Sequence, residues 1–442
     1  METAETKAMK TSVLLKRFVP YYRKYVGIMV MDLFCAALTT VCELVLPMIL
    51  RYITNVGMTD LSALTLKTIL TIGTVYLVLR IIDGMASFYM AYTGHVMGAS
   101  IETDMREDAF AHLQKLSDNY FNNTKVGQIM SRITSDLFDV TEFAHHCPEE
   151  FFIAFIKAVV SFVILARVNL LLTAIVFVLI PVMAVSCTYF NLQVRKAFKR
   201  QRNHIGELNA RIEDSLLGNK VVRAFANEAL ELKKFSHDNQ EFLQIKRQTY
   251  KYMAAFQNTI RIFDGLMYVV VIVAGGIFMM EGLIAPGDLV AYTMYITTLL
   301  ATIRRIIEFA EQFQRGMTGI ERFTELMDAD IDIFDEEGAV ALKDVEGAIS
   351  FRKVSFEYPD DHTPVLSQID LTIRPGEKVA LVGPSGGGKT TLCNLIPRFY
   401  DPTEGEILID GQNIRGVTLK SLRGNVGVVQ QDVYLFSGSV YE

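Results

Sequence analysis

Cysteine is scarce in this sequence, with five residues in 442, and no two of them have C-x-x-C spacing. They are Cys35, Cys42, Cys147, Cys187 and Cys393. An odd, dispersed set excludes a disulfide framework and a cysteine-based zinc site. Cys35 and Cys42 lie on one face of a predicted helix, so we expect them to be packing residues rather than reactive thiols.

Charged residues are also few, at 21% of the chain, whereas hydrophobic residues make up 51%. A soluble domain averages about 25% charged residues. The apolar residues are concentrated before Ile320, and from Asp328 onward the composition is that of an ordinary globular domain. The formal net charge of −6 gives no reason to expect a nucleic-acid partner. The composition therefore predicts a membrane part followed by a globular part.

The N-terminus lacks the features of a removable targeting segment. The peptide METAETKAMK contains Glu2 and Glu5, which a mitochondrial transit peptide would avoid. The first apolar segment is too long for a signal peptide and lacks an A-x-A-like cleavage site. We expect this segment to remain as a membrane anchor.

Six segments are long enough to cross the hydrocarbon core, which takes about 20 helical residues. They lie near Val26–Leu50, Leu66–Ala91, Phe151–Ala166, Leu170–Phe190, Arg261–Met280 and Asp288–Ile307. Lysine and arginine gather before Val26 and between Asn191 and Lys251, while the loops on the opposite side hold few. The positive-inside rule then places both termini in the cytoplasm. We expect a multi-pass protein of the plasma (cell inner) membrane.

Two long stretches, between the second and third spans and between the fourth and fifth, contain few glycines or prolines and have helical periodicity. They predict pairs of helices that continue into the cytoplasm, each about 37 Å long for about 25 residues. One pair would turn near Asn122–Gly127, before a helix capped near Thr134 or Ser135. The other would turn at Gly218–Asn219. Short transverse helices at these turns are one interpretation, and ordinary helix–loop–helix packing is the other.

The sequence VALVGPSGGGKTT matches the pattern G-x-x-x-x-G-K-[ST] at Gly383, Gly388, Lys389 and Thr390. The preceding residues 379–382 read as a buried strand, and residues 389–396 read as a helix that ends at a proline. Strand, glycine loop and helix are the arrangement that binds the phosphates of a nucleotide. A simple glycine turn is the alternative interpretation.

The chemistry of phosphate binding explains each position of this loop. Glycines let backbone N–H groups curl around phosphate oxygens without Cβ clashes. Lys389 would supply a charge to the β- and γ-phosphates, and the Thr390 hydroxyl would bind Mg²⁺. The remaining loop residues that we expect to contact the nucleotide are Pro384, Ser385, Gly386, Gly387 and Thr391. ATP and Mg²⁺ are thus the predicted cofactors.

Three further segments carry a resemblance to a known family. ISFRKVSFEYP alternates as a strand and ends near Tyr358, GEILIDG reads as a strand and turn, and NVGVVQQDVYLF reads as a strand that breaks at Gln430–Asp432. Tyr358, the Gly383–Thr390 loop and the Gln431-Asp432 turn resemble the A-loop, Walker A motif and Q-loop of the ATP-binding cassette. With the six spans and the long arms, nearly the whole chain resembles an exporter-type half-transporter of the ABC transporter superfamily, which includes multidrug exporters, lipid exporters and the lipid A flippase.

The resemblance implies a fold class: an α-helical polytopic membrane domain with six transmembrane helices and long intracellular extensions, followed by a partial α/β P-loop NTPase domain. We expect four regions. They are a cytoplasmic N-terminal segment with an elbow helix (1–25), the transmembrane domain (26–320), an acidic linker (321–348) and the N-terminal part of a nucleotide-binding domain (349–442).

The resemblance also implies roles for residues and partners. Tyr358 would stack on adenine, and Gln431 would approach Mg²⁺ and the attacking water, so Lys389 and Gln431 are the predicted catalytic residues and Thr390 and Gln431 the predicted metal contacts. The arm tips at 120–127 and 217–226 would be coupling helices that dock on the cassettes. A second half-transporter, membrane lipid and a small-molecule or lipid cargo are the expected partners.

Some motifs of that cassette have no match between Thr391 and Glu442. These are the L-S-G-G-Q signature, a Walker B strand ending in Asp-Glu, and the switch histidine. EILID, at 406–410, imitates Walker B, but Gly411 follows where the glutamate is required, so we expect it to be an ordinary strand and turn. On this basis we expect a transporter truncated within its nucleotide-binding domain, with little ATP hydrolysis by this chain alone. An inactive fragment and an ATP-gated membrane protein that does not transport are the alternatives.

Two polar features lie close to the membrane. The peptide HHCPEE, at 145–150, could bind a metal or could simply be the cytoplasmic end of the helix that enters the third span. Ionisable residues within the spans are costly; they are Asp32, Glu43, Arg80, Asp83, Lys157, Arg261 and Asp264. Arg80 with Asp83 and Arg261 with Asp264 would be i,i+3 pairs. They predict either interhelical salt bridges or a polar translocation cavity that favours amphipathic or charged cargo.

Overall fold

The computed structural model of the chain describes residues 9–358, 364–429 and 434–439. These residues form two compact units. The membrane unit comprises residues 18–102 and 139–318, and the cassette unit comprises residues 1–17, 103–138 and 319–442. The unit boundaries fall inside α1 (Thr11–Tyr22), α4 (His95–Leu113), α7 (Ser135–Val168) and α11 (Pro286–Met327).

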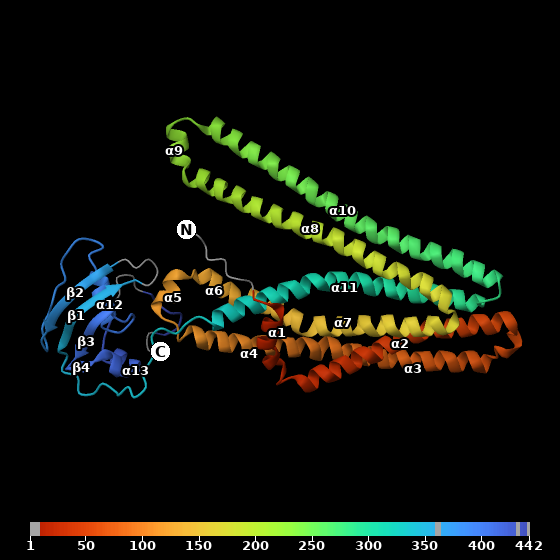
Figure 1. The fold of residues 1–442 in the computed structure, drawn as a ribbon, viewed down its shortest axis with the longest axis horizontal. Coiled ribbons are helices and arrows are strands. Elements are labelled where there is room, and N and C mark those ends of the chain that lie inside the picture. The colour runs from red at the N-terminus through yellow and green to blue at the C-terminus, as the bar shows by residue number, and fades with distance from the viewer. Residues whose placement is uncertain (1–8, 359–363, 430–433, 440–442) are drawn as a thin grey trace. The chain divides into compact units, whose positions relative to one another are not determined.

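Long helices build the membrane unit (Figure 1). Besides the helices named above, they are α2 (Val26–Thr59), α3 (Leu66–Tyr89), α8 (Leu170–Leu217) and α10 (Glu228–Met280), with the short helices η1 (Leu61–Ala63), η2 (Met90–Gly94) and α9 (Asn219–Ala224). η2 is a turn of π-helix between α3 and α4. This helical domain confirms the membrane part of the predicted fold class.

Five helical segments of the described chain are long and apolar enough to cross a membrane, and they contain the first five predicted spans. The sixth predicted span lies in α11, a long helix that is not among these five. The reason is composition, because Asp288, Arg304 and Arg305 all fall within that predicted span. In the segment 66–113, only 6% of the most apolar window is buried. Apolar surface of this kind costs about 25 cal/mol per Å² in water, so we expect lipid to cover it.

Buried tyrosines of α11 tie the core of the membrane unit together. Tyr292 donates to the carbonyl of Leu165 at 3.0 Å and lies 2.8 Å from the Thr173 hydroxyl. Tyr295 donates to the carbonyl of Leu44 at 2.7 Å. Each ring is fully buried, yet each hydroxyl has a partner, as buried phenols require.

The turn between α7 and α8 is tight, as the sequence ARVNL predicts. Asn169 precedes α8, and its side chain accepts a hydrogen bond from the backbone N–H of Leu172 at 3.0 Å. This satisfies one of the free amides that every helix start leaves. α8 and α10 then form the predicted arm, with α9 at its tip (Figure 1). The 48 residues of α8 correspond to about 72 Å of helix.

A four-stranded antiparallel sheet forms the body of the cassette unit, in the order β2-β1-β3-β4. The strands are β1 (Ile349–Glu357), β2 (Pro364–Ile373), β3 (Glu404–Ile409) and β4 (Gln412–Asn413). Ile349 of β1 is the partner of Ile373 on one side and of Ile409 on the other. The remaining elements of this unit are α5 (Asp118–Asn123), α6 (Val126–Ile133), α12 (Lys389–Leu395), η3 (Ile414–Gly416) and α13 (Leu419–Gly424).

Phe351, Val354 and Phe356 of β1 are buried in the core of this unit, together with Leu392 and Leu395 of α12. The sheet therefore rests on the helix that follows the glycine loop. The predictions of a strand over 349–358, a strand and turn over 405–411 and a helix after the loop are confirmed.

Two strand predictions are wrong for the residues that the structure describes. Residues 379–382 belong to no strand, and Val382 is 93% exposed. Residues 425–429 likewise form no strand, and Val429 is 99% exposed. An apolar segment is predicted to be a buried strand from its composition. However, a strand forms only where a neighbouring strand pairs with its backbone N–H and C=O groups. None of the four strands of the described sheet pairs with either segment.

Candidate functional site

The glycine loop adopts a conformation that only glycine tolerates at two points. Gly386 has φ = 80° and Gly388 has φ = 79°, in the left-handed region that side chains disfavour. A Cβ on Gly388 would lie 2.8 Å from Cδ2 of Leu366 and 3.1 Å from the carbonyl oxygen of Val365. Gly388 thus lets the loop close against β2 and start α12.

The charged and hydroxyl groups predicted to bind phosphate gather at this loop. Nζ of Lys389 donates to the carbonyl oxygens of Gly383 and Pro384, at 3.0 and 2.7 Å, so the ammonium lies across the mouth of the loop. Ser385 and Thr390 are exposed beside it. A loop without Cβ atoms, one ammonium and accessible hydroxyls form a donor set suited to a polyphosphate and its Mg²⁺.

Tyr358 lies next to this loop. Its hydroxyl is 3.1 Å from Oγ1 of Thr391, and its ring contacts Phe356 and Tyr400 edge-on, with centroids 5.0 and 5.7 Å apart. The ring is half-buried. The structure therefore brings Tyr358 to the predicted phosphate loop. Gln431 lies outside the described residues.

The segment at 406–410 that resembles Walker B is a strand followed by a turn, as predicted. Asp410 follows β3, and its carboxylate accepts hydrogen bonds from the backbone N–H groups of Glu346, Gly347 and Ala348 at 2.9 to 3.1 Å. Desolvation would raise the pKa of Asp410, but these three hydrogen bonds outweigh it and lower the pKa from its usual value. The carboxylate fixes the entry into β1.

The first predicted arm tip also contacts the cassette. It folds as α5 and α6, and the Asn122 side chain of α5 donates to the hydroxyl of Tyr400 at 2.8 Å. Tyr400 in turn contacts Phe356 and Tyr358. A chain of direct contacts therefore runs from α5 to the aromatic ring beside the glycine loop. Sequence reasoning located α5 but missed Tyr400, for which the sequence offers no motif.

A polar cavity of about 650 Å³ lies in the membrane unit. Its charged and imidazole lining residues are Glu43, Arg80, Asp83, His95, His146, Glu149, Glu150, Lys157 and Arg305. Arg80 pairs with Asp83 at 2.9 Å, Lys157 pairs with Glu43 at 2.6 Å, and Arg305 pairs with Glu150. The ionisable residues predicted either interhelical salt bridges or a polar cavity, and the structure contains both.

One predicted ion pair is wrong. Asp264 of α10 pairs with Arg304 of α11 rather than with Arg261 on its own helix. Sequence spacing favours the i,i+3 partner, but α11 brings a guanidinium to the same carboxylate from a neighbouring helix. Arg304 lies 40 residues away in the sequence, beyond the reach of helical periodicity.

Two family models match the chain. The model described as ABC transporter transmembrane region covers residues 29–303, and the model described as ABC transporter covers residues 366–442. An uncharacterized ABC transporter ATP-binding protein of Bacillus subtilis, YwjA, is 38% identical over 97% of this chain and 74% of its own length. A putative multidrug export ATP-binding/permease protein of the same organism, YgaD, is 29% identical over 97% of this chain and 74% of its own length. An ATP-dependent lipid A-core flippase of Syntrophus aciditrophicus is 33% identical over 97% of this chain and 70% of its own length.

Proposed function

Because the chain belongs to the ABC transporter family and is a half-transporter of the exporter type, we propose that it uses ATP to export a drug, lipid or other amphipathic solute. The observation that carries this proposal is the contact path in the cassette unit. Asn122 at an arm tip, Tyr400, Tyr358 and Thr391 of the phosphate loop touch in sequence. A change at the loop can thus reach α5, which follows α4 along the chain.

Lys389 and the loop from Gly383 to Thr391 would hold the ATP phosphates. Thr390 and Gln431 would hold Mg²⁺, which neutralises charge on the phosphates when it is bound. Tyr358 would face adenine from the position beside Thr391. The left-handed backbone of Gly386 and Gly388, which shapes the loop around its N–H groups, supports this assignment. Gln431 would orient the attacking water, so it and Lys389 are the proposed catalytic residues.

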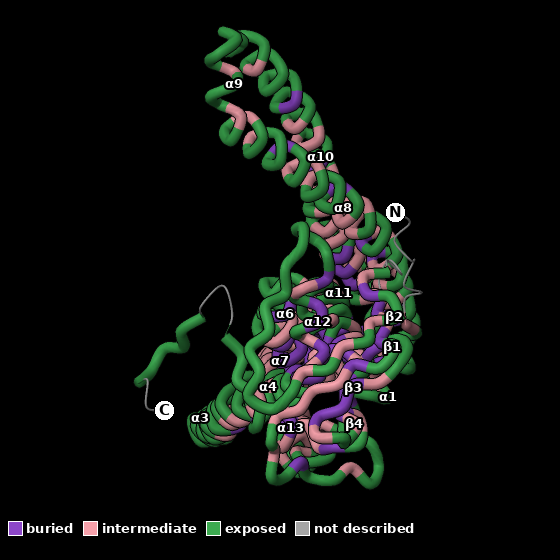
Figure 2. The backbone as a smooth tube through the Cα atoms, turned by 90° about the vertical axis from the view of Figure 1, so that its left-hand side faces the viewer, coloured by how far each residue is buried: buried purple, intermediate pink, exposed green. Residues whose placement is uncertain are grey.

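A second half-transporter is the proposed partner. The tip at α9 is exposed (Figure 2), and it carries the apolar side chains Leu216, Leu217, Val221 and Phe225, each more than 60% exposed. Such a patch is costly in water and is typical of a docking surface. We assign it to contact with a cassette of the assembled exporter.

The polar cavity would receive the cargo. Its walls combine ion pairs with threonines such as Thr39, Thr297 and Thr298, which suits a solute with both charged and apolar parts. The basic residues before Val26 and between Asn191 and Lys251 favour a plasma-membrane topology with both termini in the cytoplasm.

Hydrolysis by the 442 residues alone should be slow. Between Thr391 and Glu442 they supply no signature motif, Walker B glutamate or switch histidine, which the resemblance requires of an active cassette. We expect the purified chain to bind ATP but to turn it over slowly, and we expect rapid turnover when the chain is joined to a complete cassette. Phosphate release in the two proteins measures the difference.

Lys389→Ala tests the function. In proteoliposomes of the exporter with a complete cassette, the variant should abolish ATP-driven accumulation of solute. Lys378→Ala, which removes an exposed lysine outside the loop, is the matched control and should transport like the wild type. Transport by Lys389→Ala at the control rate would refute the proposal. Ion currents that respond to ATP without solute accumulation would instead favour an ATP-gated membrane protein. If the 442 residues alone bind no ATP, they would be an inactive fragment.

A further inference from the structure

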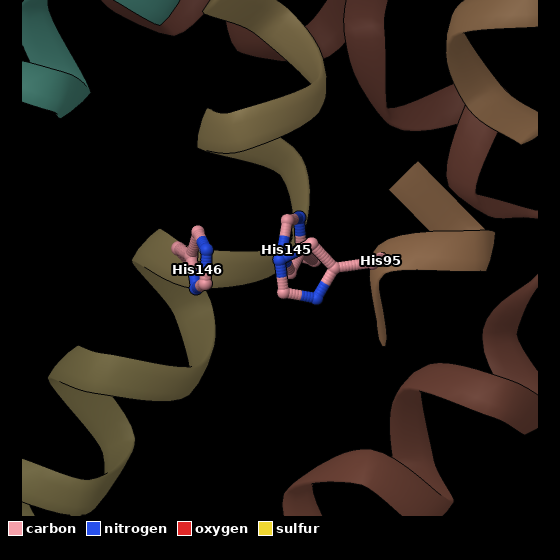
Figure 3. Close-up of side chains that lie close together, drawn as sticks. All are labelled: His95, His145 and His146. Carbon is pink, nitrogen blue, oxygen red and sulfur yellow. The ribbon is translucent and has the colours of Figure 1, made fainter. Parts of the chain in front are cut away.

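Three histidines from two helices meet in the membrane unit. His95 is the first residue of α4, directly after the π-turn η2, and His145 and His146 are neighbours on α7 (Figure 3). Their ring centroids are 3.8 Å apart for His145 and His146, 4.4 Å for His95 and His145, and 5.1 Å for His95 and His146. One possible ligand atom from each lies within 4.8 Å of the others. A tetrahedral Zn²⁺ with Zn–N bonds of 2.0–2.1 Å separates its nitrogens by about 3.3 Å, so small rotations of the rings would close the site.

Backbone carbonyls fix two of these rings in the form that binds a metal. Nδ1 of His95 lies 2.6 Å from the carbonyl oxygen of Ala91, and Nδ1 of His145 lies 3.1 Å from that of Thr141. A carbonyl can only accept, so each neutral ring carries its proton on Nδ1 and keeps a lone pair on Nε2. Metal-binding histidines are generally held in this way by their second nitrogen. Nε2 of His146 lies 3.7 Å from Oε2 of Glu142 on the preceding turn. The other nitrogen of that ring, Nδ1, is therefore the one that would bind the metal.

Two buried polar atoms at this place have no hydrogen-bond partner among the described residues. They are Nε2 of His145 and Oδ1 of Asp32, and each residue is only 2% exposed. Both flank Gly94: a Cβ there would lie 3.3 Å from Oδ1 of Asp32 and 3.6 Å from Cδ2 of His145. An unsatisfied buried polar group costs about 1–3 kcal/mol. A cation that binds both an imidazole nitrogen and a carboxylate oxygen would satisfy the two atoms together.

We propose that His95, His145 and His146, with Asp32 as the neighbouring carboxylate, bind one borderline transition-metal dication of the Zn²⁺ class. Imidazole nitrogens select such ions over Mg²⁺ and Ca²⁺, which prefer oxygen ligands. Three imidazoles provide three positions of a tetrahedral site, and the Asp32 carboxylate lies nearby on the other side of Gly94. The bound metal would tie α4 to α7.

The charged residues around the three histidines favour a dication, and the polar cavity gives such an ion access to the rings. His95 and His146 line the polar cavity described above, so an ion can reach the rings from that side. The cations of the cavity wall, Arg80, Lys157 and Arg305, are each paired with a carboxylate. Glu149 and Asp32 have no ion-pair partner in the part of the chain that the structure describes, so their carboxyl oxygens are not already held by a cationic side chain.

A second cluster in the membrane unit is a weaker candidate and serves as the control. His237, Asp238 and Glu241 also lie within 4.8 Å of one another. However, the Asp238 carboxylate is held by Arg211 at 2.5 Å, and the other two residues are exposed. Asp238 is paired and the other two side chains are exposed, so no unpartnered buried group there requires a metal.

The experiment measures metal binding by the purified chain in detergent, prepared without a histidine tag and stripped with a chelator. Zn²⁺ is titrated against a chromophoric chelator, and Co²⁺ is added separately to record its d–d absorption. We expect one Zn²⁺ per chain and the intense visible bands of tetrahedral Co²⁺. His145→Ala should weaken Zn²⁺ binding at least about 100-fold, since loss of a supporting residue alone costs 10–100-fold. Asp32→Asn should weaken it by about tenfold or more. His237→Ala should bind like the wild type.

Binding that is lost in His237→Ala but kept in His145→Ala would overturn the proposal, as would a wild-type chain that binds no Zn²⁺. If His145→Ala elutes as an aggregate, His95→Gln replaces it, because His95 is exposed and its loss should not disturb the core. Unchanged Zn²⁺ affinity and an unchanged Co²⁺ spectrum in a folded His95→Gln protein would also overturn it.

Discussion

At the scale of single residues, Gly388 is the glycine of the phosphate loop that is packed most tightly against β2. Gly388→Ala should lose nucleotide binding, because its φ of 79° is strained for any side chain and its Cβ would meet Leu366. We expect a destabilisation of about 1–3 kcal/mol. Gly424→Ala is the control, since a Cβ there meets nothing within 4 Å. Fluorescent-ATP binding and thermal unfolding distinguish the two; equal behaviour of the two variants would contradict the assigned role of Gly388.

Asp410 gives a pH dependence with a definite sign. Its pKa is lower in the fold than in the unfolded chain, because three amide hydrogen bonds outweigh desolvation. Its stabilisation is therefore complete above the unfolded pKa of about 3.9 and is lost as the pH falls through the lower folded pKa. The protection of the amides at residues 346–348 from hydrogen exchange, expressed relative to the intrinsic rate at each pH, should fall in that acid window.

The matched variants for this effect are Asp410→Asn and Asp330→Asn. The first removes the charged acceptor, so exchange at 346–348 should already be faster at neutral pH and should no longer respond to acid in this way. Asp330 is exposed in the linker, and its variant should exchange like the wild type. An acid response that survives in Asp410→Asn would show that another group controls these amides.

Residues adjacent in the sequence were the predictable part of the site. The residues of the loop from Gly383 to Thr391 follow one another in the chain, so the sequence motif alone is enough to predict the conformation of the loop. The contact between Asn122 and Tyr400 joins residues 278 positions apart, and no local pattern reports it. Likewise HHCPEE indicated His145 and His146, but His95 arrives from another helix after a π-turn and was missed.

At the scale of elements, α4 and α7 pack closely because Gly98 lacks a side chain. A Cβ there would lie 2.9 Å from Cγ2 of Thr141 and 3.1 Å from Nδ1 of His145. Gly98→Val should separate the two helices and destabilise the membrane unit by about 1–3 kcal/mol. Gly84→Val on α3, where a Cβ meets nothing within 4 Å, is the control.

Thermal unfolding can be followed with a thiol-reactive dye, because four of the five cysteines are buried. The Gly98→Val chain should expose its thiols at a lower temperature than the wild type, and the Gly84→Val chain should not. A transition unchanged by Gly98→Val would show that α4 and α7 do not depend on this contact.

The contact between α5 and the cassette core predicts a defect in coupling rather than in hydrolysis. In the exporter with a complete cassette, Asn122→Ala removes one hydrogen bond, worth about 0.5–1.5 kcal/mol. We expect transport per ATP hydrolysed to fall about two- to tenfold. Asn123→Ala is the control, since Asn123 bonds only within its own helix. Equal loss of transport in both variants would remove α5 from the coupling path.

Elements were predicted well where one segment contains its own hydrogen bonds. Helices do so, and most of the long helices follow from apolar length and periodicity alone. Strands do not, because their bonds go to a partner elsewhere in the chain. β1 and β3 pair with each other. Two other apolar segments, residues 379–382 and 425–429, pair with none of the described strands. Composition alone could not distinguish these cases.

At the scale of the whole molecule, the chain combines a transmembrane region over residues 29–303 with a cassette region over residues 366–442. Helices such as α4, α7 and α11 run through both compact units. We propose that these shared helices transmit movement from one unit to the other. The proposed mechanism needs this continuity, since energy from nucleotide binding must act on a cavity in the membrane unit.

The most direct test places a spin label at the exposed position Leu192 of α8 in each protomer of the assembled exporter in lipid nanodiscs. The distance between the two labels is measured with and without MgATP. We predict a clear shift of the distance distribution with MgATP in the wild-type background and none with Lys389→Ala. Bound MgATP with an unchanged distance in the wild-type background would contradict the coupling of the phosphate loop to the membrane helices.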